Sequence, residues 1–283
     1  MFYYSVDDIQ SVNSKSKICI CDRNSNKNIL LIGSCRITPF INYFANDCYF
    51  DSYNILAIMV HNTEMIALSK TIIDNEGIKQ EIYKTTIFVH EFCRNFEYLN
   101  TSRDTEKNIY KIKDKFDIHV SLPNYQDPSI YAKDIMFYKN TNDFHKYMDK
   151  EISLEEFSNI LKDSQTKEKK RYYDVISKSD LPELYDFVVE NIHNKRIAHT
   201  INHPSNFLFI KMYQIILKNY FNRQLPDAVI QLNNDREILS STGYATKLTF
   251  YDKECLDFTI NEEYLNEKES NNYILECLSE KKL

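Results

Sequence analysis

Three short apolar runs in the first third of the chain predict buried β-strands. Residues 29–32, 55–60 and 85–89 are almost continuously apolar, and the first run ends directly at Gly33. Continuous runs, rather than alternating ones, are typical of strands that are covered on both faces, as in a parallel sheet. Short strands separated by helical stretches indicate βαβ units, so the sequence predicts an α/β fold with a mainly parallel sheet.

Helical periodicity is clearest in the second half of the chain. Residues 154–161 carry apolar side chains at helical spacing. A helix over residues 181–192 is expected to have Asp180 as its N-cap and Pro182 in its first turn. Residues 204–221, which begin with a proline, are apolar nearly all round and predict a buried helix that starts at this proline.

Beyond residue 226 the pattern becomes looser. Residues 247–251 predict a strand, and the charged stretch 266–283 predicts either a surface helix or partial disorder. The sequence contains no internal repeat and no low-complexity linker. We therefore expect one catalytic α/β domain over residues 1–225, with residues 226–283 as a C-terminal extension that packs on the same domain.

Composition narrows the class of protein. The 283 residues are 43% hydrophobic, which suits one large domain, and the formal charge of -6 argues against a general nucleic-acid binder. The sequence shows no apolar run of membrane-spanning length and no signal-peptide pattern at its start. Seven cysteines without a zinc-binding spacing indicate reduced thiols and no metal site, which is the pattern of a cytoplasmic protein.

The first group of chemically capable residues follows the first predicted strand, in the order Gly33, Ser34, Cys35 and Arg36. Ligands of open α/β sheets bind at the carboxyl ends of the strands. Gly33 permits a sharp turn, after which backbone N–H groups and the charge of Arg36 can face an anion or an oxyanion. The next helix is expected to start near Thr38, with Thr38 as its N-cap. The alternative is that Cys35 is a small buried hydrophobic residue and Arg36 a surface ion-pair partner.

A second group lies just before the predicted buried helix. Residues 199–206 contain two histidines, two asparagines and a serine. A loop beside a rigid helix is a favourable place for functional groups, and His203 can serve as a general base near neutral pH. The alternative is that Asn202 and Ser205 only cap the helix, while His203 bonds to a backbone carbonyl.

Three further features carry weaker signals. The prolines of residues 122–128 predict a loop that contains Asn124. His90 and Glu91 end the third predicted strand, where they either face the site, form a buried ion pair or lie at the surface. The charged run 167–171 is typical of a solvated helix face, with a contact to cofactor phosphates as the alternative.

Taken in order, these motifs resemble the WcbI family of polysaccharide-biosynthesis enzymes, which are relatives of the SGNH hydrolases. The resemblance covers residues 28–220. It rests on the strand followed by Gly-Ser-Cys-Arg, on Leu-Pro-Asn at 122–124, and on Asn-His-Pro-Ser at 202–205 before an apolar helix. The family usually has Gly-Asn-Cys in the first motif, so Ser34 is a departure.

The resemblance implies a three-layer α/β/α fold of the SGNH-hydrolase-like (flavodoxin-like) kind and binding of coenzyme A or acetyl-CoA. It also implies acetyl transfer to a sugar or nucleotide sugar in glycan assembly. Cys35 falls where SGNH hydrolases keep their nucleophilic serine, and His203 falls in the region of their catalytic histidine. Thr200 stands where those enzymes usually have an aspartate, so the hydrolase triad is incomplete.

From these residues we expect direct transfer, in which His203 takes the proton of the acceptor, with an acyl-enzyme on Cys35 as the other form. The alternatives are an SGNH-like esterase or deacetylase and a non-catalytic protein that binds coenzyme A or a glycan. No nucleic-acid partner is expected, and a homo-oligomer is left open. The expected cofactor-binding residues are Gly33, Ser34, Arg36, Asn124, Asn202 and Ser205.

Overall fold

The computed structural model describes residues 2–5, 17–21, 23–59, 85–91, 116–123, 130–200, 203–235 and 246–280. The chain forms two compact units, which are described separately. The first comprises Met1–Asn124, Lys178–Pro182 and Phe209–Ile238, and the second comprises Tyr125–Ser177, Glu183–Leu208 and Leu239–Leu283. The predicted domains, residues 1–225 and 226–283, stay a prediction, because a compact unit is not by itself a domain that folds alone.

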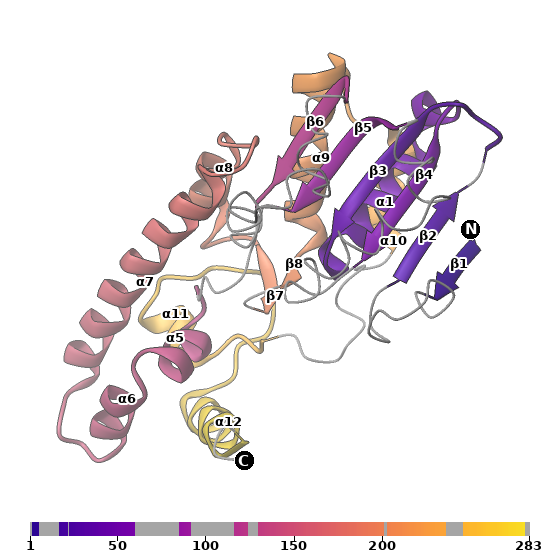
Figure 1. Ribbon diagram of the computed structural model, residues 1–283. Coiled ribbons are helices and arrows are strands. Elements are labelled where there is room, and N and C mark those ends of the chain that lie inside the picture. Colours follow the sequence, from indigo (N-terminus) through magenta and orange to yellow (C-terminus); the bar gives the residue numbers. More distant parts are fainter. Residues whose placement is uncertain are drawn as a thin grey trace, which may run out of the picture. The chain divides into compact units, whose positions relative to one another are not determined.

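The first unit is built on a six-stranded sheet in the order β1-β2-β4-β3-β5-β6 (Figure 1). Strands β4, β3, β5 and β6 are mutually parallel, whereas β2 is antiparallel to β4 and β1 is antiparallel to β2. The three predicted strands form the centre of this sheet, and every residue of β3 is buried. The strands are β1 Phe2–Ser5, β2 Lys17–Cys21, β3 Asn28–Gly33, β4 Asn54–Met59, β5 Thr85–Glu91 and β6 Ile118–Leu122.

The order of the parallel strands creates a switch point at the end of β3. The chain passes from β3 to β4 on one side and then to β5 on the other side of β3. Proteins with open α/β sheets bind ligands at such a point, where connections leave two adjacent strands in opposite directions. Gly33 is the last residue of β3 and Glu91 is the last residue of β5, so these two residues mark the edge of the sheet at the switch point.

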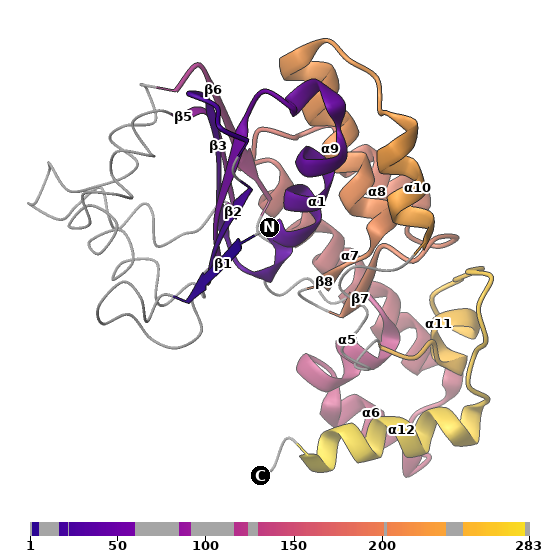
Figure 2. The ribbon, with the colours of Figure 1, turned by 90° about the vertical axis from the view of Figure 1, so that its right-hand side faces the viewer.

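Helices cover one face of this sheet, as Figure 2 shows with the sheet nearly edge-on. They are α1 (Thr38–Asn46), α9 (Asn206–Phe221), which belongs to this unit from Phe209 onward, and α10 (Asp227–Asp235). Aromatic side chains join α1 to α9. The rings of Phe40 and Phe209 meet edge to face at 5.8 Å, and those of Tyr43 and Tyr213 lie 5.2 Å apart.

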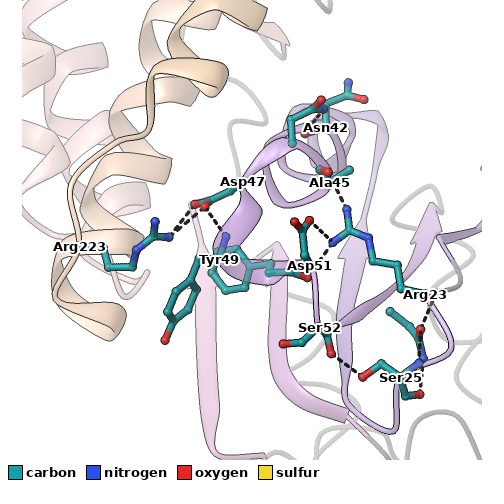
Figure 3. Close-up of polar contacts among 12 residues, drawn as sticks. Arg23, Ser25, Asn42, Ala45, Asp47, Tyr49, Asp51, Ser52 and Arg223 are labelled. Atoms are coloured by element: carbon teal, nitrogen blue, oxygen red, sulfur yellow. Dashed lines mark hydrogen bonds and ion pairs between the residues drawn. The ribbon is translucent and has the colours of Figure 1, made fainter.

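Asp47, fully buried just after α1, ties this helix to α9 (Figure 3). Its carboxylate accepts hydrogen bonds from the Tyr213 hydroxyl at 3.1 Å and from Arg223 Nη1 at 3.0 Å. It also accepts from the Tyr49 N–H at 3.1 Å, which caps the short 3-10 helix η3 (Cys48–Phe50). Burial and the charge of Asp47 raise the pKa of Tyr213, so its hydroxyl keeps the proton that it donates.

The second unit is largely helical around an aromatic core. Phe157 packs against Tyr147 with stacked rings at 5.1 Å and against Tyr251 edge to face at 5.6 Å. The fully buried Asp252 accepts a hydrogen bond from the Ala132 N–H at 2.7 Å, which fixes α11 against α5. The helices are α5 Ala132–Tyr138, α6 Thr141–Met148, α7 Leu154–Ile176, α8 Leu184–Asn191, α11 Phe250–Glu254 and α12 Glu267–Glu280, and a short hairpin joins β7 Ala198–Thr200 to β8 His203–Pro204.

Several predicted helices are confirmed with different ends. The helix predicted over 154–161 is α7, and a capping box between Ser153 and Glu156 fixes its start at Leu154. The helix continues beyond the predicted end, to Ile176. The buried helix α9 begins at Asn206, since Pro204 pairs with Ala198 in the β7–β8 hairpin.

Two predicted caps and one strand are wrong. Asp180 does not cap α8, because its carboxylate accepts from the Ser121 N–H at 2.6 Å. Thr38 lies inside the first turn of α1, after a 3-10 turn has already started the helical path. Residues 247–251 do not form a strand, because Thr249 caps α11. Of the two alternatives for the C-terminal stretch, the helix is confirmed as α12.

The sheet and its helices confirm the predicted α/β class with a mainly parallel sheet. None of the helices in the described part of the chain is both long enough and apolar enough to cross a membrane.

Candidate functional site

The predicted site residues divide between the two units. Gly33, Ser34, Cys35 and Arg36 lie in the first unit, and His203 lies in the second. Ser205 also belongs to the second unit, whereas Asn124 and Asn202 lie outside the described residues.

The chain turns sharply at the end of β3. Gly33 ends the strand, and residues Cys35–Ile37 form a 3-10 turn (η2) that runs into α1. The Ser34 hydroxyl caps this turn by accepting from the Arg36 N–H at 3.4 Å and from Arg36 Nε at 3.0 Å. The predicted turn after the first buried strand is therefore present, and its serine stabilises the turn itself.

Glu91 reaches this turn from the end of the neighbouring strand β5. Its Oε2 accepts from the Ser34 N–H at 2.5 Å, and its Oε1 pairs with Arg36 Nε. The side chains of Arg36 and Glu91 are 5% and 4% exposed, so this is a buried ion pair. For Glu91 the structure therefore shows the buried ion pair among the alternatives, whereas the alternative of a surface ion pair for Arg36 is wrong, because its side chain is buried.

The requirement for glycine at position 33 is one of space. A Cβ atom added to Gly33 would lie 2.6 Å from Ile37 Cγ2, 2.8 Å from Glu91 Oε2 and 2.9 Å from Glu91 Cγ. Contacts this short do not occur between real atoms, so any larger residue would push Glu91 or the start of the helix aside. The strand, the carboxylate and the turn thus pack together without room for a side chain.

Cys35 is the exposed member of the turn. Partial desolvation of its thiol, together with the negative charge of Glu91, raises its pKa, and the positive charge of Arg36 and a hydrogen bond to Ser34 oppose this rise. A thiol with a raised pKa is largely protonated at neutral pH, and only the thiolate is a strong nucleophile. The thiol is thus accessible to a ligand while being weakly activated for covalent attack.

The second group of residues forms the β7–β8 hairpin of the second unit. His203 lies directly across from Thr200 in the antiparallel pairing, and it is half-buried. The pairing places a threonine, rather than an acid, opposite His203.

Ser205 is buried and bonded to the main chain. Its Oγ donates to the Arg196 carbonyl at 2.5 Å and contacts the Ile197 carbonyl at 3.1 Å, and its N–H also donates to the Ile197 carbonyl, at 2.9 Å. These bonds close the hairpin immediately before α9. The predicted contact of Ser205 with a cofactor stays a prediction.

Arg196 anchors the base of this hairpin. Its guanidinium makes a two-pronged pair with Glu262, with Nε at 2.8 Å and Nη2 at 2.6 Å from the carboxylate oxygens. Nη1 donates to the Thr246 carbonyl at 3.0 Å, and the Thr246 N–H donates in turn to the His199 carbonyl. The hairpin is therefore held by residues from the C-terminal part of the chain, which no local sequence pattern indicated.

Two other sequence features have structural partners. His90, at the end of β5, contacts the Glu91 carbonyl through Nδ1 at 2.9 Å and His119 Nε2 through its own Nε2 at 2.8 Å. In the charged run of α7, Glu168 is buried against Arg171, and Lys169 contacts His193. Among the described residues, no group of three or more acidic, histidine or cysteine side chains has an arrangement that could hold a metal ion.

Comparison with known proteins gives a likeness to a solved structure. No protein-family model matches the chain, and no curated protein matches it in sequence. A structure of WcbI, described as a novel polysaccharide biosynthesis enzyme, matches with a TM-score of 0.54 and 14% identity over 89% of each chain. That structure is of the native protein without a disulfide bond between coenzyme A and one of its cysteines. The present chain therefore shares the fold of WcbI, which agrees with the predicted three-layer α/β/α architecture.

Proposed function

We propose that the protein transfers an acetyl group from acetyl-CoA to a hydroxyl or amine of a sugar or nucleotide sugar during glycan assembly. The observation that carries the proposal is the exposed Cys35 on a rigid turn at the switch point between β3 and β5. Ligands of this class of sheet bind at that point. The likeness in fold to WcbI, a polysaccharide biosynthesis enzyme, also supports a role in glycan assembly.

The residues of the turn suit an uncharged reacting group better than a free anion. Glu91 balances the charge of Arg36 and accepts from the Ser34 N–H, so the Ser34 N–H and Arg36 Nε are engaged by a carboxylate of the protein itself. A thioester is uncharged at its reacting carbon, and a neutral thiol can pack against it. We therefore assign the Gly33–Arg36 turn to the thioester end of acetyl-CoA.

Two properties of Cys35 favour direct transfer over an acyl-enzyme. Its raised pKa keeps it in the thiol form. To attack the thioester, the thiol would need another group to act as a base and remove its proton. In direct transfer, His203 takes the proton from the acceptor oxygen or nitrogen as that atom attacks the thioester carbonyl. Coenzyme A then leaves with its sulfur as the thiolate, so that one acyl bond forms and one thioester bond breaks.

An SGNH-like esterase or deacetylase is the competing function. It requires an activated nucleophile and a histidine oriented by an acid. The raised pKa of Cys35 and the pairing of Thr200 opposite His203 both argue against this chemistry. Transfer to a sugar needs neither feature, because the acceptor itself is the nucleophile.

Release of coenzyme A from acetyl-CoA, measured with and without sugar or nucleotide-sugar acceptors, tests the proposal. We expect release that depends on an acceptor, with an acetylated sugar as the second product. Release without an acceptor would indicate hydrolysis, and no release with any acceptor would overturn the transferase assignment. A Cys35→Ala variant sharpens the result, since direct transfer predicts a loss of less than about tenfold and an acyl-enzyme predicts nearly complete loss.

A further inference from the structure

The carboxylate of Glu91 is nearly removed from water and must be satisfied by the protein. It lies at the end of β5, beside the turn that follows β3, and its side chain is 4% exposed. A buried charge is costly unless it is paired and hydrogen-bonded. Glu91 Oε2 accepts a hydrogen bond from the Ser34 N–H, whereas Oε1 forms the ion pair with Arg36 Nε and makes no hydrogen bond to the described residues.

These two bonds fall on either side of Cys35. Ser34 precedes the cysteine and is held through its backbone, whereas Arg36 follows it and is held through its guanidinium. The Ser34 hydroxyl bonds to Arg36 Nε at 3.0 Å, which closes the network. The two residues that flank Cys35 are therefore both tied to the same carboxylate.

Gly33 is what allows Glu91 to come this close. The atoms that a Cβ at position 33 would meet include Oε2 and Cγ of Glu91, at 2.8 and 2.9 Å. The glycine and the glutamate are therefore two parts of one arrangement, although 57 residues separate Ser34 from Glu91 along the chain.

We propose that Glu91 is the positioning residue of the Gly33–Arg36 turn, which it clamps on both sides of Cys35 through the Ser34 N–H and the Arg36 guanidinium. The clamp is an observation about this turn, and only its importance for catalysis rests on the proposed function. Burial, with the charge of Glu91 as a smaller contribution, raises the pKa of Cys35, so a fixed cysteine that stays in the thiol form favours direct transfer over a covalent intermediate.

The charges of Glu91 and Arg36 predict shifts of the Cys35 pKa in opposite directions when each is removed, whereas a purely structural role does not. Among the described residues, the charged groups that act on the Cys35 thiol are Arg36, which lowers its pKa, and Glu91, which raises it. Removing the glutamate charge leaves Arg36 uncompensated, so the pKa of Cys35 falls. Removing the arginine charge has the opposite effect. A loosened turn would instead expose the thiol to water in both variants and would shift its pKa downward in both.

The test is the rate at which iodoacetamide alkylates Cys35, measured by mass spectrometry between pH 6 and pH 10 in the intact protein. The exposed Cys48 of the same unit is the internal control. Glu91→Gln is expected to move the midpoint of the Cys35 profile to lower pH and to speed alkylation at pH 7 on the order of tenfold. Arg36→Gln is expected to move it to higher pH, and the double variant is expected to lie between the two single variants.

Midpoints that shift in the same direction in both single variants, or that do not shift, would overturn the proposal. Because Glu91→Gln leaves a buried arginine unpaired, circular dichroism must first show that the variant is folded. If it is not folded, the single variants Arg36→Gln and Glu91→Asp are measured instead. Glu91→Asp keeps the negative charge, so its Cys35 alkylation profile is expected to have a midpoint near that of the wild type. The assay needs no acetyl-CoA, so a protein with the predicted shifts and no acyl transfer would refute the proposed function and leave the clamp intact.

Discussion

The turn after β3 and the β7–β8 hairpin carry similar polar residues but hold them in different ways. In the turn, Ser34 and Arg36 bind a carboxylate that lies 57 residues away from Ser34 in the chain. In the hairpin, Ser205 binds a carbonyl only 9 residues upstream. The turn is therefore held by a long-range charge, whereas the local bond of Ser205 in the hairpin is supplemented by the long-range pair of Arg196 with Glu262. Both serines therefore stabilise the local structure of their own unit.

The largest effect that separates the two regions is expected from His203→Ala. Loss of a general base reduces the rate by about 10²- to 10⁴-fold. We expect acceptor-dependent release of coenzyme A to fall by this factor, with little change in the thermal unfolding midpoint. The matched control is His145→Ala, an exposed histidine of α6 in the same unit, which is expected to keep the wild-type rate. Turnover of His203→Ala within a few-fold of the wild type would remove His203 from the mechanism.

Gly33→Ala tests how tightly the turn is packed. The added methyl group would meet Ile37 and Glu91, and overpacking of this kind costs about 1–3 kcal/mol of unfolding free energy. Urea denaturation measures the loss, with Ser34→Ala as the neighbouring control that removes a hydroxyl but adds no atoms. A Gly33→Ala protein as stable as the wild type would show that the close approach of Glu91 is not required.

Ser205→Ala asks whether the hairpin serine serves the fold or the ligand. Its hydroxyl is buried and bonded to the carbonyls of Arg196 and Ile197, so its loss is expected to cost about 1 kcal/mol of unfolding free energy. Urea denaturation and the KM for acetyl-CoA are measured on the same variant. An increase in KM without a loss of stability would contradict the structural role. The exposed Ser279→Ala in α12 controls for the loss of a surface hydroxyl.

The smallest effect is expected from the pH dependence of the second unit. Burial and the nearby charge of Lys169 lower the pKa of His193 in the folded state. Below the ordinary histidine pKa, near 6.5, the unfolded chain then takes up a proton before the folded one does. Unfolding free energy therefore declines as the pH falls from about 6.5, by a few tenths of a kcal/mol after solvent screening. His193→Gln should flatten this decline, whereas His145→Gln should not, as urea titrations at pH 7.5 and 5.5 would show.

Local patterns in the sequence were enough for the central strands and for the position of the first turn. The run that ends at Gly33 is β3, because four consecutive apolar residues can be buried on both faces only inside a covered sheet. The same reasoning correctly predicted β4 and β5. Local reasoning also predicted a sharp turn at Gly33, although the reason for the glycine is a neighbouring side chain.

What the sequence did not reveal depends on tertiary contacts. Glu91 was one of several candidates at a strand end, and only the strand order brings it to Arg36. Asp180 looked like a helix cap but binds the backbone of β6, since the fold brings that strand within reach. Asp47, which no motif contained, is fully buried and bonded to α9 and Arg223. Each case is a polar side chain whose partner lies far along the chain.

The central claim is that coenzyme A binds at the turn that carries Cys35, and protection from alkylation tests it most directly. The wild-type protein is treated with iodoacetamide at increasing concentrations of desulfo-coenzyme A, which has no thiol to consume the reagent. We predict that the analogue slows alkylation of Cys35 in a saturable manner and leaves the exposed Cys48 unchanged. Equal rates at Cys35 with and without the analogue would contradict the claim.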